Sequence, residues 1–379
     1  MILLIVNWLE VDRRYLFLRI CGAAMLSFLI VMVLAPRVIR FLIRRRIGDS
    51  PQFNHRYLEQ ITRHKSRTPT MGGILIVIAI LISSLVFSDF IGTMYVRMSL
   101  VAMVWLGTLG GVDDWLKLRH SAGKTSRDGL KSWEKLLFQV GLAVLLALYT
   151  YAYGSQSHVR IRGEITNPAH NFYLPFTAEP ILMSQLAYTI ITVLTMVGAS
   201  NAVNLTDGMD GLAAGCVMIV SMVLLILAQL VGVSSYANLF NLPLVYRSEE
   251  MTVICSAMLG ACVGFLWYNA HPAQVFMGDT GSLTLGGLMA YVAVVTRQEM
   301  LLLIAGGVFV IEAMSVILQV GYFKLTRPAA GAPGRRLFRC APLHYHFHLG
   351  GWPENKVVVR FWMLCLMFAA LALATLKLR

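Results

Sequence analysis

Aspartates follow three of the apolar segments of this chain. Asp113 and Asp114 stand in V-D-D-W-L-K, Asp207 and Asp210 in N-L-T-D-G-M-D-G, and Asp279 in F-M-G-D-T-G-S. A single aspartate at such a point is commonly a helix cap. Carboxylates gathered from so many places, with asparagines and glycines beside them, instead suit a hard cation that prefers oxygen ligands, and we expect Mg²⁺.

Basic side chains accompany these carboxylates. On a helix, Lys117 lies four residues from Asp113 and three from Asp114, so the three side chains share one face. The two aspartates of D-G-M-D have the same three-residue spacing, and we expect them on a helical face as well. Lys65 stands in H-K-S-R-T-P-T-M-G-G. A metal and lysines around phosphates are typical of phosphoryl transfer. The sequence has no G-x-x-x-x-G-K-[ST] motif, which excludes a P-loop enzyme.

The elements that must position these residues are membrane helices. Of the 379 residues, 57% are hydrophobic and 13% are charged, whereas about a quarter are charged in a typical soluble domain. We therefore predict an all-α polytopic integral membrane protein that forms a single domain over residues 1–379. Its transmembrane helices, about ten, are predicted from apolar runs long enough, or nearly so, to cross the roughly 30 Å hydrocarbon layer. The runs are 18–36, 71–88, 98–112, 136–154, 181–200, 212–232, 251–268, 282–296, 300–323 and 357–376.

Basic residues are distributed unevenly among the connecting loops. Of the 32 lysine and arginine residues, 21 lie in loops 37–70, 113–135, 199–211, 269–281 and 324–356. The positive-inside rule places these loops, and the aspartates in them, on the cytoplasmic side. Both termini and a short hairpin near 155–180, predicted from its alternating pattern, then lie on the periplasmic side. The net charge of +13 suits this topology and contact with anionic lipid, and we expect no nucleic-acid partner.

The segment L-H-Y-H-F-H adds a second candidate site. If it is extended, its alternate histidines His344, His346 and His348 point to one side. Such a fork could bind zinc or copper. Recognition of a substrate and an uninvolved surface loop are the alternatives.

These motifs, in this order, resemble the polyprenyl-phosphate N-acetylhexosamine-1-phosphate transferase superfamily, and most closely its peptidoglycan branch. The matching segments are T-P-T-M-G-G, D-D-W-L-K, N-A-V-N-L-T-D-G-M-D-G-L-A-A-G, F-M-G-D-T-G-S, A-P-L-H-Y-H-F-H and G-W-P-E-N-K-V-V-V-R-F-W. The resemblance implies a multi-pass protein of the bacterial inner membrane with periplasmic termini and an active-site cleft that faces the cytoplasm. It also implies Mg²⁺-dependent transfer of phospho-MurNAc-pentapeptide from UDP-MurNAc-pentapeptide to undecaprenyl phosphate, which yields lipid I and UMP.

The resemblance also implies roles for individual residues. Asp113 and Asp114 match the paired acidic residues, and Asp279 matches the magnesium ligand. Lys65 and Lys117 complete the expected catalytic set. The expected substrate-binding residues are Thr70, Lys135, Asn201, Asn204, Asp207, Asp210, Asn269, Phe276, His344 and His346. The phenylalanine among them is expected under the uracil ring.

The histidine segment departs from the family pattern. The family loop reads P-x-H-H-H-[FY]-E, and it helps to recognise the sugar nucleotide rather than a transition metal. This chain has Tyr345 in place of the middle histidine and His348 in place of the acid. The resemblance therefore extends only to His344 and His346.

Two other functions fit parts of the pattern. A sister transferase that uses UDP-GlcNAc would share the aspartates but should lack the G-W-P-E-N-K-V-V-V-R-F-W and T-P-T-M-G-G matches. A secondary transporter would place its charges near mid-bilayer in broken spans, whereas the aspartates here lie at the ends of apolar runs.

For the reaction, we expect the lipid phosphate to attack the phosphorus that bears MurNAc in a single displacement. Asp113 or Asp114 would accept a proton, and a covalent aspartyl intermediate is the alternative. A homodimer is compatible with the sequence, which leaves the oligomeric state open.

Overall fold

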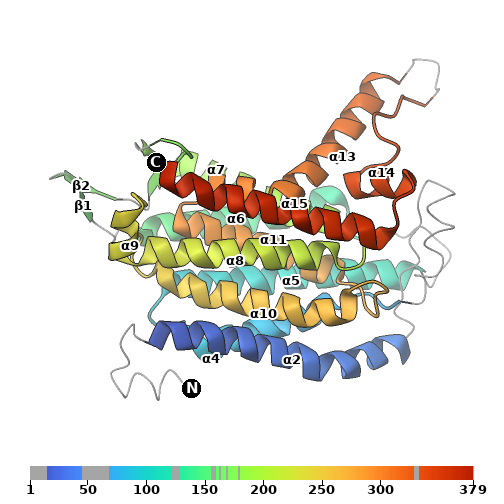
Figure 1. Ribbon diagram of the computed structural model, residues 1–379, viewed down its shortest axis with the longest axis horizontal. Helices are drawn as coiled ribbons and strands as arrows, with labels where there is room; N and C mark the ends of the chain where they lie inside the picture. The colour runs from blue at the N-terminus through green and yellow to red at the C-terminus, as the bar shows by residue number, and fades with distance from the viewer. Residues whose placement is uncertain are drawn as a thin grey trace.

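The computed structural model describes residues 15–44, 68–121, 129–154, 159–161, 164–167, 170–177, 180–327 and 333–378. Most of the regular structure in these ranges is helical, and the long helices form a bundle (Figure 1). They are α2 (Leu16–Arg44), α4 (Gly73–Phe87), α5 (Met94–Ser121), α6 (Ser132–Gly154), α7 (Gln185–Thr206), α8 (Leu212–Gly232), α10 (Met251–Asn269), α11 (Gly278–Thr296), α13 (Gly307–Leu325) and α15 (Glu354–Ala374). Shorter helices are α9 (Ser234–Leu239), η4 (Ser248–Glu250), α12 (Glu299–Ala305), α14 (Leu343–Leu349) and η5 (Thr375–Leu378).

The predicted hairpin is present between α6 and α7. Strand β1 (Val159–Ile161) pairs antiparallel with β2 (Glu164–Thr166), with Arg160 opposite Ile165. A second short pair follows, in which β3 (Asn171–Phe172) is antiparallel to β4 (Ile181–Leu182). The first pair lies in the segment where the alternating pattern predicted a hairpin. The second ends at Ile181–Leu182, the first residues of the predicted span 181–200, and α7 begins after it at Gln185.

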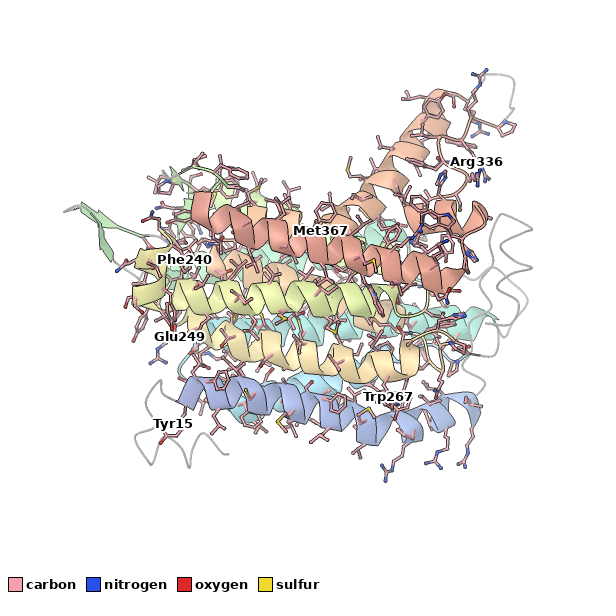
Figure 2. All side chains as sticks on the ribbon, viewed as in Figure 1. Tyr15, Phe240, Glu249, Trp267, Arg336 and Met367 are labelled. Carbon is pink, nitrogen blue, oxygen red and sulfur yellow. The ribbon has the colours of Figure 1, made fainter. Side chains whose placement is uncertain are left out.

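The membrane class is confirmed. Within the described ranges, eight helices are long and apolar enough to cross a bilayer. Each of the other two predicted spans is also a helix: α4 is apolar but has only 15 residues, and α11 begins with the polar sequence G-D-T-G-S. Large apolar side chains such as Trp267 and Met367 are about 70% exposed on the outer surface of the bundle (Figure 2), as expected for contact with lipid.

One predicted span is interrupted. The run 300–323 was expected to be continuous, but α12 ends at Ala305 and α13 starts at Gly307. A Cβ at Gly307 would lie 2.7 Å from the ring of Phe368 on α15. The glycine therefore lets α15 pack close to the break. From this point α13 leans away from the other helices (Figure 1).

α11 is the central helix of the bundle. Every residue from Thr280 to Thr296 is buried, and the helix packs against α4, α5, α7 and α8. Glycine contacts make this packing close, because a Cβ at Gly110 of α5 would lie 2.3 Å from the carbonyl oxygen of Asp279. The sequence G-D-T-G-S at the start of α11 is therefore held between neighbouring helices.

The two ends of the bundle carry different elements. α2 begins and α15 ends at the end that carries β1 and β2, whereas α14 lies at the opposite end (Figure 1). Arg336 lies at the α14 end, far from Tyr15 and Glu249 (Figure 2). The aspartates of the sequence motifs belong to the α14 end, because α5, α7 and α10 finish there and α8 and α11 start there.

Candidate active site

α5 carries the first part of the site. The helix continues past the predicted apolar run, so Asp113, Asp114 and Lys117 lie on helical backbone. Lys117 Nζ is 2.7 Å from Asp113 Oδ2, which confirms the predicted i,i+4 pair. Asp113 is fully buried, and its other carboxylate oxygen accepts a hydrogen bond from the Leu130 backbone N–H at 2.7 Å.

Asp279, in the first turn of α11, faces the same lysine. Its Oδ2 is 3.1 Å from Lys117 Nζ and 2.7 Å from Lys135 Nζ. Lys135, on α6, also lies 2.6 Å from Asp113 Oδ2. Asn204, in the last turn of α7, donates a hydrogen bond to Asp279 Oδ1 at 2.9 Å. Two lysines thus bridge two carboxylates that are far apart in the sequence.

Asp114 has a different set of contacts from its neighbour. One carboxylate oxygen accepts the Asp279 backbone N–H at 3.0 Å. The other accepts the Thr280 N–H at 3.0 Å and the Thr280 hydroxyl at 2.7 Å. The first N–H groups of a helix have no partner within the helix, and here Asp114 supplies one from another helix.

Three aspartates together form what we call the Asp279 cluster: Asp113, Asp114 and Asp279. Each offers an oxygen, and these atoms lie within 4.8 Å of one another. Carboxylate oxygens at such spacing are the ligands of a hard divalent cation. In this structure the ammonium groups of Lys117 and Lys135 each contact both Asp113 and Asp279, so these carboxylates are positioned to bind positive charge. The residues therefore fit a metal ion.

Asp207 caps the end of α7 beside this cluster. Burial raises its pKa to about 7, and the negative charges of Asp279 and Asp114 add to the shift. A carboxylate in this position is sensitive to any positive charge bound near it.

Asp210 lies elsewhere, and the predicted helical face with Asp207 is wrong. Residues 207–211 form a turn between α7 and α8. Asp210 Oδ2 is 2.9 Å from His271 Nδ1 and accepts the Ala273 backbone N–H at 3.1 Å. Glu354 accepts the Asp210 backbone N–H at 2.8 Å. We call this second group, Asp210, His271 and Glu354, the Asp210 cluster; its ligand atoms also lie within 4.8 Å of one another.

Thr70 and Phe276 lie on two segments that pair with each other. The Phe276 backbone N–H donates to the Pro69 carbonyl, and the Phe276 carbonyl accepts the Gly72 N–H, both at 2.8 Å. The side chains of Thr70 and Phe276 are partly exposed. Thr70 lies three residues before the start of α4, and Phe276 lies two residues before the start of α11. Lys65 lies outside the described residues.

Two predicted asparagines hold loops or helices together. Asn269 accepts the Gly211 N–H at 3.0 Å and donates to the Val275 carbonyl at 2.8 Å. Asn201 donates to Gln139 Oε1 at 2.8 Å, which links α7 to α6 one turn before Asn204. The hydrogen bonds described here join Asn269 to the backbone of neighbouring loops and Asn201 to α6.

The histidine segment is helical, so the condition for the metal fork, an extended segment, is not met. Leu343–Leu349 forms α14, and alternate residues of a helix do not share a face. His346 Nδ1 accepts the Arg339 N–H at 3.1 Å, and His348 Nδ1 contacts the Trp352 carbonyl at 2.8 Å. The three imidazoles have different partners and do not form a common fork.

His344 is the buried member of the segment. Its Nδ1 is 3.1 Å from Glu312 Oε2, and both side chains are fully buried. Among the described residues, its Nε2 has no hydrogen-bond partner, and this nitrogen lies so close to Gly208 that a Cβ there would clash with it. Tyr345 donates its hydroxyl to the Gly208 carbonyl at 2.8 Å. α14 is therefore packed on the turn that follows Asp207.

Sequence reasoning missed several residues of these groups. Glu312 stands inside a predicted span, where an acidic residue is a functional candidate by default, so the signal was present in the sequence. His271 and Glu354 stand in the motifs N-A-H-P-A-Q and W-P-E-N-K. Their pairing with Asp210 depends on segments more than 60 residues apart, and no local pattern indicates it.

Comparison with known proteins agrees with this geometry. The model of glycosyl transferase family 4 matches residues 96–297, which include the Asp279 cluster. A phospho-N-acetylmuramoyl-pentapeptide-transferase of Desulfotalea psychrophila is 40% identical over 97% of this chain and 95% of the relative. The proteins of the same name from Oleidesulfovibrio alaskensis and Thermodesulfovibrio yellowstonii are also 40% identical, with the same coverage. The chain therefore belongs to glycosyl transferase family 4 and, within it, to the phospho-N-acetylmuramoyl-pentapeptide-transferases.

Proposed function

We propose that the protein transfers phospho-MurNAc-pentapeptide from UDP-MurNAc-pentapeptide to undecaprenyl phosphate, releasing UMP and forming lipid I. The observation that carries this proposal is the Asp279 cluster, in which two lysines bridge Asp113 and Asp279 at the end of a membrane bundle. The similarity to the named transferases over 97% of the chain supplies the substrate class. The whole chain acts as a single transferase domain.

Asp279 and Asp113 are the residues that would hold Mg²⁺. Their Oδ2 atoms share two ammonium partners, and a metal ion would take over the role of one of these cations. When bound, Mg²⁺ neutralises phosphate charge and orients the diphosphate for displacement.

The chain's own residues supply the remaining parts of the mechanism. A phosphate oxygen of undecaprenyl phosphate attacks the phosphorus attached to MurNAc, and the bond from that phosphorus to the oxygen of UMP breaks. Lys117 and Lys135 stabilise the charge on the phosphates through charged hydrogen bonds. Lys65 is assigned to the same task. A lipid phosphate has a second pKa of about 6, so its nucleophilic oxygen needs little help from a base.

The two neighbouring aspartates have separate roles in this proposal. Both oxygens of Asp114 already accept donors from the start of α11, so Asp114 is a positioning residue for Asp279. Asp113 faces the lysines and is the candidate for contact with the reacting groups. Single displacement fits this division, because neither aspartate has to act as a covalent nucleophile.

The nucleotide-sugar site is assigned to the surface beside the Asp279 cluster. We assign Phe276 to the uracil ring. Asn204 is assigned to the diphosphate, because it hydrogen-bonds Asp279, one of the residues that would hold the metal ion. His344 and His346 are assigned to recognition of the sugar nucleotide. Further residues are assigned to the surroundings of the nucleotide-sugar site: Thr70, Asn201, Asp207, Asp210 and Asn269. Of these, Asp210 and Asn269 hold neighbouring loops in place.

The α14 end is proposed to face the cytoplasm, in the inner membrane of a bacterium. This assignment rests on the excess of basic residues in the loops at that end. A cysteine in place of Pro333 should then be shielded from a membrane-impermeant maleimide in intact cells, and one in place of Thr177 should react. The converse labelling would reverse the orientation.

We also propose a homodimer, which the mass of the detergent-solubilised protein would test.

The proposed reaction is tested by measuring UMP release from the purified protein. UDP-MurNAc-pentapeptide and undecaprenyl phosphate together should yield UMP and lipid I in equal amounts. UDP-GlcNAc with the same lipid should yield none. UMP release only from UDP-GlcNAc, or none from either donor, would contradict the proposal.

A further inference from the structure

Lys135 is the contribution of α6 to the site around the Asp279 cluster. Its ammonium group lies 2.6 Å from Asp113 Oδ2 and 2.7 Å from Asp279 Oδ2. α6 begins at Ser132, only three residues before this lysine. A side chain so close to the end of a helix is positioned by the contacts that hold the helix against its neighbours. The contacts on the same face of α6, one turn deeper in the bundle, are therefore important for the position of the ammonium group.

Gln139 makes these deeper contacts. It lies four residues after Lys135, on the same face of α6, and its side chain is buried. Its Oε1 accepts a hydrogen bond from Asn201 Nδ2 at 2.8 Å, and its Nε2 lies 3.5 Å from Ser200 Oγ. The Ser200 hydroxyl donates to the Leu283 carbonyl at 3.0 Å. A buried polar link thus joins α6, α7 and α11.

This link repeats the arrangement of the active site one turn deeper in the bundle. In both layers, α6, α7 and α11 each contribute polar groups. The outer layer contains the side chains of Lys135, Asn204 and Asp279. The inner layer contains Gln139, Asn201, Ser200 and the carbonyl group of Leu283. On each helix the two layers are three or four residues apart, about one turn of 5.4 Å, so the same three helices are aligned twice.

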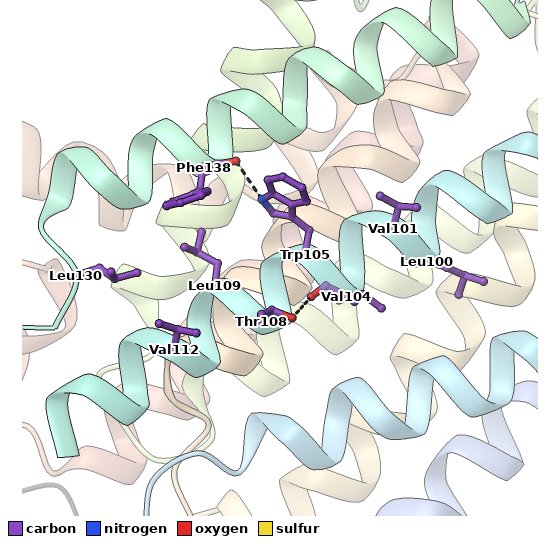
Figure 3. Close-up of a pocket in the computed structure, with 9 residues that line it drawn as sticks. All are labelled: Leu100, Val101, Val104, Trp105, Thr108, Leu109, Val112, Leu130 and Phe138. Atoms are coloured by element: carbon purple, nitrogen blue, oxygen red, sulfur yellow. Dashed lines mark hydrogen bonds between the residues drawn. The ribbon is translucent and has the colours of Figure 1, made fainter. Parts of the chain in front are cut away.

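α6 is also joined to α5 at the level of the inner layer. The carbonyl of Phe138, the residue before Gln139, accepts the Trp105 indole N–H at 3.2 Å (Figure 3). Hydrogen bonds have preferred directions, whereas apolar contacts are non-directional and supply little driving force between helices in lipid. The bonds at Phe138 and Gln139 therefore fix the rotation and the height of α6 relative to α5 and α7.

We propose that Gln139 is a positioning residue for Lys135. Its amide holds α6 at the height from which the ammonium group reaches both Asp113 and Asp279, and it does not itself contact the substrates. Asn201 supports the site from α7 through the same hydrogen bond. The importance of this link for catalysis rests on the proposed function, whereas the link itself is a feature of the helix packing.

Gln139→Met tests the proposal, because methionine keeps the length of the side chain and removes the amide. The kcat for UMP release should fall about tenfold, since a displacement of about 1 Å in an active site costs up to about 10²-fold in rate. Both KM values should stay within about twofold of the wild type. In a Lys135→Ala protein, the same substitution should cost less than about twofold more, because the group that it positions is absent.

The matched control is Thr150→Val, also on α6. The Thr150 hydroxyl is buried and lies 3.0 Å from the Tyr291 hydroxyl on α11, about 16 Å further along the helix than Gln139 at 1.5 Å per residue. Both substitutions remove a buried hydrogen bond between helices, so both should lower the melting temperature by a similar amount. Only Gln139→Met should lower kcat by more than about twofold.

A second measurement requires no reaction of the substrates. Acetic anhydride acylates lysine side chains, and peptide mass spectrometry gives the rate at Lys135, with the exposed Lys356 as the internal reference. Lys135 should be acylated at least about threefold faster in Gln139→Met than in the wild type, because its ammonium group is no longer held between two carboxylates. Thr150→Val should match the wild type. This result decides about the link even if the protein released no UMP.

Asn201→Ala removes the other side of the bond and replaces the first variant if a thermal melt shows that Gln139→Met does not fold. Equal losses of kcat in Gln139→Met and Thr150→Val would reduce Gln139 to a general packing role. Unchanged acylation of Lys135 in Gln139→Met and Asn201→Ala, or fully additive losses with Lys135→Ala, would show that the link does not position this lysine.

Discussion

The two carboxylate clusters at the α14 end of the bundle differ in the partners of their oxygens. In the Asp279 cluster, Asp113 and Asp279 face the side-chain ammonium groups of Lys117 and Lys135. In the Asp210 cluster, the carboxylates accept backbone N–H groups, such as that of Ala273, and Asp210 also contacts the imidazole of His271, a member of the same cluster. Side-chain cations can exchange for a metal or a substrate, whereas backbone donors remain in place as long as the loops are folded.

This difference separates chemistry from architecture. Asp210 and Glu354 join the turn before α8, the segment after α10 and the start of α15, so they stabilise the connections at this end of the bundle. Asp114 belongs to the Asp279 cluster by position but contacts backbone N–H groups as well. Membership of a cluster therefore does not by itself identify a reacting group. The hydrogen-bond partners of each carboxylate oxygen have to be compared as well.

Among the tests that distinguish the two clusters, removal of divalent cations should have the largest effect on activity. EDTA should abolish transfer, and Mg²⁺ or Mn²⁺ should restore it, because carboxylate oxygens prefer hard cations. Mg²⁺ should also raise the melting temperature of the wild type and of Asp210→Asn, but not that of Asp279→Asn. Full activity in excess chelator, or restoration by Zn²⁺ alone, would contradict a magnesium site at the Asp279 cluster.

Asp279→Asn should lower turnover at least about 10²-fold, as expected when a major electrostatic contribution to catalysis is lost. The amide keeps the shape of the side chain and removes its charge, so the protein should still fold. Asp89→Asn is the matched control at the other end of the bundle, where Asp89 pairs with Arg247. Turnover is measured as UMP release, and a loss below about fivefold at Asp279 would remove it from the reaction.

Glu312→Gln should lower kcat/KM about tenfold, near the 1.4 kcal/mol of one good charged hydrogen bond. The carboxylate holds the buried ring of His344, so His344→Ala should have a similar effect and the double variant should lose little more. The loss should appear mainly in the KM for the nucleotide sugar and leave the Mg²⁺ requirement unchanged.

His348→Ala is the control for this pair, because the imidazole of His348 contacts the carbonyl of Trp352, four residues further along the chain. Its activity should stay within about threefold of the wild type. Fully additive losses at positions 312 and 344, or equal losses at 344, 346 and 348, would show that Glu312 does not act through His344.

Asp210→Asn should have the smallest effect on turnover and should act on stability instead. Loss of the charged acceptor of His271 and Ala273 should lower the free energy of unfolding by about 1–3 kcal/mol, with kcat within about threefold of the wild type. A thermal melt and a UMP assay on the same preparation measure both. A large loss of kcat at an unchanged melting temperature would place Asp210 among the reacting groups and remove the distinction between the clusters.

The sequence by itself determined the class of the protein and the local part of the site. Apolar runs predicted the helices because hydropathy is a property of consecutive residues, which does not depend on how the helices are arranged in the bundle. The pair Asp113 and Lys117 was predictable for the same reason, since helical geometry alone brings residues four apart together. The motifs also indicated that Asp279 belongs with them.

Only the tertiary structure decided which distant groups meet. It turned Asp114 towards the first N–H groups of α11, drew Asp210 to His271, and paired His344 with Glu312. It also coiled the histidine segment into α14. Each of these contacts joins atoms about 3 Å apart in segments that are separated by 32 to 165 residues along the chain. Spacing along the chain carries no information about such contacts, because the length of the intervening helices and loops does not determine their relative orientation.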